Sequence, residues 1–62
     1  MQAKVIKMIG TKTFVLSLIE TVDNEYVVEC ETSHSVGSSL PMKDYKIASL
    51  IFDLKLQELE GN

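Results

Sequence analysis

The segment from Pro41 to Glu60 carries apolar residues on two faces, which is more than a chain of this length can bury by itself. Ala, Leu, Lys, Gln and Glu dominate it and Val and Thr are absent, which predicts an α-helix. Because a helix advances about 100° per residue, the apolar residues fall into two nearly opposite stripes. One stripe comprises Tyr45, Ala48, Phe52, Leu56 and Leu59, and the other comprises Ile47, Leu50, Ile51 and Leu54. Only one stripe can face the core of so small a domain, so we expect another molecule to cover the other.

The length and the cysteine content favour oligomerisation. We expect residues 1–62 to form one small domain, and a chain of this size buries only about 60% of the surface that its unfolded form exposes. Cys30 is the only cysteine and His34 the only histidine, so no internal disulfide can form and a zinc site within one chain would need carboxylates. Association with a second copy is the support that remains. We therefore expect a homo-oligomer, most simply a homodimer, without a cofactor or a metal ion.

Charge and hydropathy limit the partners of this chain. Lys4 and Lys7 interrupt the first apolar residues, and no apolar run approaches the ~20 residues of a membrane-spanning helix. We therefore expect a cytoplasmic protein with no membrane partner. The net charge of -3 and the absence of arginine argue against nucleic acid as the main partner. The alternative is a nucleic-acid-binding or regulatory protein that uses Lys4, Lys7 and Lys12.

Three β-strands are predicted before the helix, at residues 3–9, 13–22 and 26–33. Alternation places Phe14, Leu16 and Leu18 on one face of the second strand, and Tyr26, Val28 and Cys30 on one face of the third. A two-residue turn at Asp23 and Asn24 would mix these faces. A three-residue loop that also includes Glu25 keeps them consistent and places Leu18 opposite Cys30. In the first strand, either Ile6 and Met8 or Val5 and Ile9 face inward.

These elements predict an α+β fold, in which a three-stranded antiparallel β-meander packs on one C-terminal α-helix (β-β-β-α). Pro41 suits the first helical position and Gly61 suits the position just past the helix end. We assign the stripe with Tyr45 and Phe52 to the core because it carries the aromatic bulk, while the reverse assignment stays open. The alternation of Leu50, Phe52, Leu54 and Leu56 also leaves open a strand in place of the helix.

The outer stripe of the helix is the leading candidate for an interface. Burying one large apolar side chain contributes about 1.5–3 kcal/mol, so covering four of them rivals what a small core supplies. The predicted interface residues are Ile47, Leu50, Ile51 and Leu54. The outer face of the sheet keeps Val15, Ile19 and Val27 among polar residues, either as plain surface or as a second contact. We therefore expect an interaction module that works as a homodimer or binds another protein.

Two further groups of residues are candidates for chemistry. The polar loop before the helix, with Ser35, Gly37, Ser38 and Ser39, could bind a partner or hold an anion, although serines at this place more often cap the helix. Cys30 and His34, with Glu29 and Glu31 nearby, are the only pair that resembles a metal or nucleophile site. We expect no enzyme, and the alternative is an enzyme whose site lies between subunits.

Overall fold

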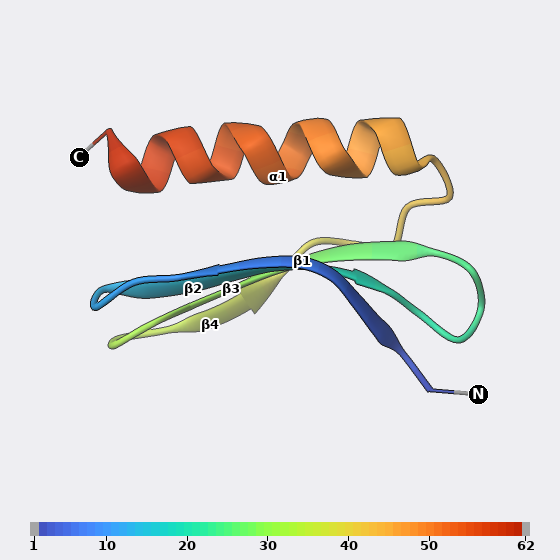
Figure 1. The fold of residues 1–62 in the computed structure, drawn as a ribbon, viewed down its shortest axis with the longest axis horizontal. Coiled ribbons are helices and arrows are strands. Elements are labelled where there is room, and N and C mark those ends of the chain that lie inside the picture. Colours follow the sequence, from blue (N-terminus) through green and yellow to red (C-terminus); the bar gives the residue numbers. More distant parts are fainter. Residues whose placement is uncertain (1, 62) are drawn as a thin grey trace.

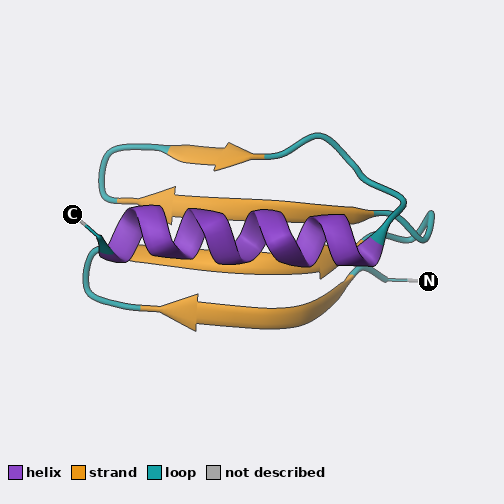
Figure 2. Cartoon of the chain, turned by 90° about the horizontal axis from the view of Figure 1, so that it is seen from above, coloured by secondary structure: helices purple, strands orange, loops and turns teal. Residues whose placement is uncertain are grey.

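The computed structural model describes residues 2–61 and shows an antiparallel four-stranded sheet with one helix across one face (Figures 1 and 2). The strands β1 (Lys4–Gly10), β2 (Phe14–Glu20), β3 (Tyr26–Thr32) and β4 (Val36–Ser38) are neighbours in chain order, and α1 (Tyr45–Glu60) follows them. The predicted α+β class and the C-terminal helix are confirmed. The predicted number of strands was wrong, because part of the serine-rich loop forms β4.

Backbone pairing, rather than apolar side chains, makes β4 a strand. Thr32 Oγ1 accepts hydrogen bonds from the N–H groups of His34 and Ser35, which closes a tight turn after β3. At the far end of β4, the Ser39 N–H donates to the Val28 carbonyl at 2.9 Å, and the Val28 N–H donates to Ser39 Oγ at 3.0 Å. The side chains of Thr32 and Ser39 therefore hold the two ends of this short edge strand in register with β3.

The β2–β3 hairpin has the predicted faces but a different register. Leu18 lies opposite Val28 rather than Cys30, and Leu16 lies opposite Cys30. The loop has three residues as predicted, but they are 22–24, because the Thr21 N–H donates to the Glu25 carbonyl at 2.8 Å. Asn24 has a φ of 62°, a left-handed conformation that asparagine tolerates well. The shift by two residues leaves every side chain on its predicted face.

Neither predicted assignment of the first strand was correct, because β1 carries a β-bulge between Val5 and Lys7. The extra residue breaks the alternation. Ile6 and Ile9 pack against the core, while Val5 and Met8 are exposed on the other face of the sheet.

The core lies between α1 and the two central strands. Its buried residues are Phe14, Leu16, Leu18, Val28, Ala48 and Phe52. This confirms that the stripe of Ala48 and Phe52 faces the sheet, with Leu56 and Leu59 packed at its margin. Tyr45 is 42% exposed and makes an edge-on ring contact with Tyr26 instead.

The helix begins later than predicted and ends where predicted. Asp44 is its N-cap, and the Asp44 carboxylate accepts from the Lys46 N–H at 2.8 Å. Pro41 therefore lies outside the helix, in a segment held to β3 by paired backbone hydrogen bonds between Met42 and Tyr26. At the other end, the Gly61 N–H donates to the Gln57 carbonyl.

Candidate functional site

The outer face of α1, which we define as Ile47, Leu50 and Leu54, is exposed on the side away from the sheet. These side chains are 51%, 57% and 54% exposed. No other helix or strand of residues 2–61 lies on the side of α1 away from the sheet (Figure 1). Ile51, the fourth residue of the predicted stripe, lies at its border and is partly buried against the core. The structure thus brings three of the four predicted residues together on one open helix face and places the fourth at the edge.

The outer face of α1 has a positively charged residue at one end and a negatively charged residue at the other. Lys46 precedes Leu50 by four residues, and Glu58 follows Leu54 by four. Residues four apart on a helix form a continuous ridge, so one ridge reads Lys46, Leu50, Leu54 and Glu58. The ridge is positive at its N-terminal end, apolar in the middle and negative at its C-terminal end.

A groove of about 350 Å³ runs beside α1, above the inner surface of β3 and β4. A helix about 10 Å wide covers two strands spaced about 4.8 Å apart, so α1 leaves β4 uncovered (Figure 2). The groove is lined by Val28, Cys30 and Thr32 of β3, by Ser35, Gly37, Ser38 and Ser39, and by Ile51, Lys55 and Leu59 of α1.

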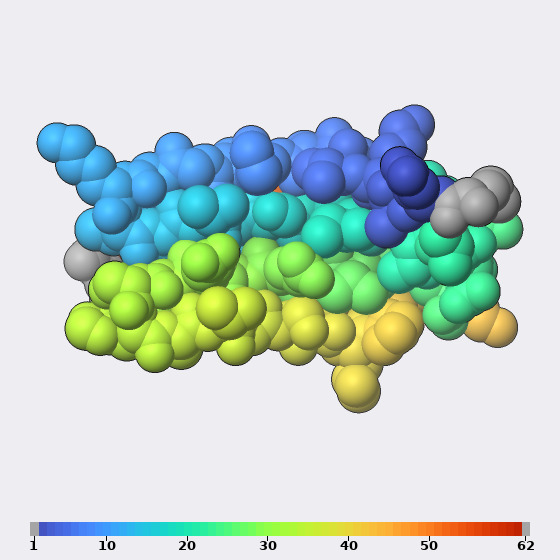
Figure 3. Space-filling view, turned by 90° about the horizontal axis from the view of Figure 1, so that it is seen from below, coloured from blue at the N-terminus to red at the C-terminus, as the bar shows by residue number. Residues whose placement is uncertain are grey.

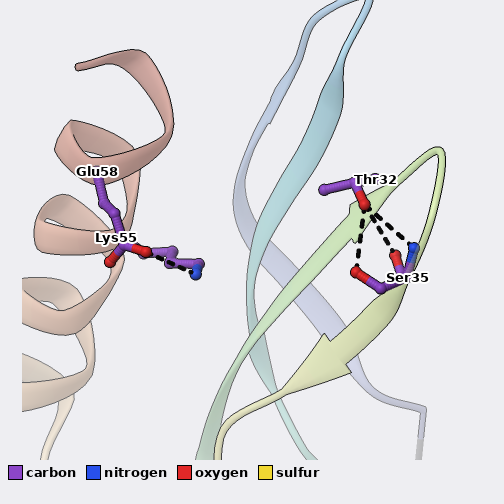
Figure 4. Close-up of polar contacts among 4 residues, drawn as sticks. All are labelled: Thr32, Ser35, Lys55 and Glu58. Carbon is purple, nitrogen blue, oxygen red and sulfur yellow. Dashed lines mark hydrogen bonds and ion pairs between the residues drawn. The ribbon is translucent and has the colours of Figure 1, made fainter. Parts of the chain in front are cut away.

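The four serine and glycine residues predicted as an anion or partner loop therefore lie together, but at the C-terminal half of α1. The first free N–H groups of the helix are instead satisfied by Asp44 at the opposite end. Lys55 is the cation that lines the groove, and it already donates to Glu58 at 3.4 Å (Figure 4). Thr32 and Ser35 hydrogen-bond to each other (Figure 4). This arrangement gives the serines no helix terminus with which to hold an anion, and that role stays a prediction.

Cys30 and His34 are placed in different surroundings. Cys30 is a free thiol on β3 and lines the groove, whereas His34 is exposed in the turn between β3 and β4. Among residues 2–61 no three histidine, cysteine or acidic side chains come together as metal ligands. The geometry supports neither of the two residues as part of a shared site within one chain.

The three N-terminal lysines do not form one basic surface. Lys7 turns toward the helix, where its Nζ donates to Ser49 Oγ at 3.1 Å and lies 3.9 Å from an Asp53 carboxylate oxygen. Lys4 is at the start of β1, and Lys12 lies beyond its other end. A phosphate backbone would therefore meet separated single charges here.

The open face of the sheet carries an apolar surface that sequence reasoning underestimated. It comprises Val5, Met8, Val15, Ile19, Val27, Val36 and Leu40. Figure 3 views this face, on the side of the sheet opposite α1. The sequence pattern indicated only Val15, Ile19 and Val27. Recognising the β-bulge in β1 and the pairing of β4 would have added the other four.

Comparisons with protein families, curated proteins and solved structures find no match for this chain. Within residues 2–61, no helix is both long enough and apolar enough to cross a membrane.

Proposed function

We propose that this chain is a small protein-interaction module that acts as a homodimer, with the outer face of α1 as the contact between the two copies. The ridge of Lys46, Leu50, Leu54 and Glu58 is the observation that carries the proposal. A two-fold axis perpendicular to α1 places the ridges of the two copies antiparallel. The first residue of one ridge then lies beside the last residue of the other, and the second beside the third. Leu50 then packs on Leu54 of the second copy, and Lys46 approaches Glu58.

The charges favour this orientation over a parallel one. A parallel pair would place Lys46 beside Lys46 and Glu58 beside Glu58, which is destabilising, whereas the antiparallel pair joins opposite charges at both ends. Exposed ion pairs contribute only about 0.2–1 kcal/mol each, so they select the orientation rather than supply the affinity.

The affinity comes from the apolar middle of the face. Fully burying one such side chain contributes about 1.5–3 kcal/mol. Because each of the three is about half exposed in the single chain, roughly half of that stabilisation would be gained when the second copy covers it. Three residues thus offer roughly 2–5 kcal/mol per chain, comparable to the ~3–5 kcal/mol that a core of this size supplies. Self-association is a large part of what stabilises such a fold.

We propose a binding role without catalysis, because Cys30 and His34 lie in different surroundings and the acidic residues are spread over turns, strands and helix. We also propose a cytoplasmic setting, which suits a chain whose single cysteine is unpaired.

The test is the mass of the protein in solution. Light scattering on a sizing column should give about twice the 6.9 kDa of one chain for the native protein and close to one chain for Leu50→Glu with Leu54→Glu. The matched control is Val22→Glu with Val36→Glu, which places the same charges on two exposed apolar residues outside α1 and should stay dimeric. A native monomer, or a control that dissociates while the helix variant does not, would contradict the proposal.

A further inference from the structure

An unbroken apolar row crosses the open face of the sheet at one end. Val5 lies opposite Ile19, and Ile19 lies opposite Val27. Leu40 extends the row on the β4 side, because it follows Ser39, which is hydrogen-bonded to Val28, and it is 85% exposed. Along β1 and β2 the apolar surface continues through Met8 and Val15. Beside β3, in contrast, the face becomes acidic.

The two charged residues that the strands turn to this face are Glu29 and Glu31. Glu29 lies between Ser17 of β2 and Ser38 of β4, and Glu31 lies between Val15 and Val36. Both glutamates are exposed, and within residues 2–61 neither takes part in an ion pair. The strands place no lysine on this side, so the open face combines an apolar half over β1 and β2 with an acidic line along β3.

We propose that the open face binds an amphipathic helix of a partner protein, with an apolar stripe and lysine or arginine residues along one flank. A helix about 10 Å wide lying along β1 and β2 would cover Val5, Met8, Val15 and Ile19. The flank of the partner helix that is nearer to β3 then lies above that strand, where its cationic side chains meet Glu29 and Glu31. Charge complementarity across an interface selects the partner and raises the association rate.

The same charges exclude a second copy of this chain as the occupant. Two open faces packed on each other would bring four glutamates together. The α1 helix of another copy has no continuous basic flank to set along Glu29 and Glu31, because Lys46 shares one flank of its outer face with Asp53 and the other flank carries Glu58. The occupant must therefore be a different, basic segment.

This inference names the partner class of the proposed interaction module, but it does not depend on the dimer contact. The outer face of α1 and the open face lie on opposite sides of the molecule (Figure 1). A dimer formed through α1 would display both of its open faces, so that a partner with two basic helices would gain avidity.

The experiment uses three synthetic peptides of about 18 residues, long enough to hold a helix. The first places leucine and lysine at helical spacing, the second replaces every lysine with glutamate, and the third scrambles the order of the first. Calorimetric titration of the native protein should give a dissociation constant about tenfold lower for the lysine peptide than for either control. Glu29→Lys with Glu31→Lys should reverse the preference between the two charged peptides. Asp23→Lys with Glu60→Lys, which changes the net charge equally at positions outside β3, should keep the native preference.

Amide chemical shifts locate the binding. With the lysine peptide, we expect the largest shifts at Met8, Ser17, Glu29 and Glu31 and small ones at Leu50 and Leu54. Equal affinity for all three peptides, the largest shifts on α1, or no effect of the charge reversal at Glu29 and Glu31 would each overturn the inference. Whether the dimer forms is measured separately, as the mass of the native protein in solution. The monomeric Leu50→Glu, Leu54→Glu variant should still bind the lysine peptide.

Discussion

The ammonium group of Lys7 lies 4.9 Å from the centroid of the Phe52 ring, so that a strand at the edge of the sheet is connected to the most buried aromatic residue of the helix. The β-bulge at Ile6 makes this contact possible because it turns Lys7 to the inner face, opposite Leu18. The aliphatic stem of Lys7 covers the margin of the core while its charge reaches Ser49 and Asp53. Lys7, which the sequence suggested as a contact to nucleic acid, is thus a structural residue.

Replacing Lys7 should separate the contribution of its stem from that of its charge. We expect Lys7→Met to lower the free energy of unfolding by about 0.5–1 kcal/mol, because it keeps an apolar stem but loses the cation–π contact and the polar contacts to Ser49 and Asp53. Lys7→Ala should cost more, since the margin of the core is then uncovered. Urea unfolding measures both, with the exposed Lys4→Met as control. A Lys7→Met variant as stable as the native protein would show that the charge of Lys7 makes no net contribution to stability.

The hairpin between β2 and β3 should depend on the backbone of Asn24. A left-handed conformation costs a residue with a Cβ atom roughly 1–2 kcal/mol, and asparagine and glycine tolerate it best. We therefore expect Asn24→Ala to lower the thermal midpoint and Asn24→Gly to leave it within a few degrees. Asp23→Ala is the control in the same loop. Equal midpoints for the alanine and glycine variants would mean that residue 24 is not held in this conformation in solution.

The antiparallel orientation of the proposed dimer predicts a charge-swap result. Lys46→Glu would place two carboxylates together at each end of the contact, and we expect the dissociation constant of the dimer to rise about tenfold. Adding Glu58→Lys to that variant exchanges the two charges and should restore the native constant. Sedimentation equilibrium measures all three proteins, with Lys12→Glu as a control for net charge. If the double variant stays as weak as Lys46→Glu, the two residues do not meet across the contact.

Alternation and periodicity predicted the parts of this fold that depend on burial. Phe14, Leu16 and Leu18 face the helix because their period matches a strand with one buried face, and Ala48 and Phe52 face the sheet for the corresponding reason in a helix. The second, exposed stripe was found by the same rule. Its function as an interface stays a prediction.

The parts that could not be predicted depend on hydrogen bonds and local geometry instead. Val36–Ser38 has one apolar side chain and a glycine, so only the backbone bonds to β3 define it as a strand. The β-bulge at Ile6 has no residue that marks it in the sequence. The helix starts at Tyr45 because Asp44 caps it, although Pro41 is also a common start signal. Together these features bring Val5, Met8, Val36 and Leu40 to the open face, which is why that surface was underestimated.

An isotope-filtered NOE experiment on a mixture of ¹³C-labelled and unlabelled chains detects only contacts between different copies, so it tests directly whether the outer face of α1 joins the two chains. We expect NOEs between the methyl groups of Leu50 in one copy and Leu54 in the other, with weaker ones to Ile47. Intermolecular NOEs that come only from Val5, Met8 or Val36, or no intermolecular NOEs from α1 at concentrations where the native mass is that of two chains, would contradict the assignment of the outer face of α1 as the contact.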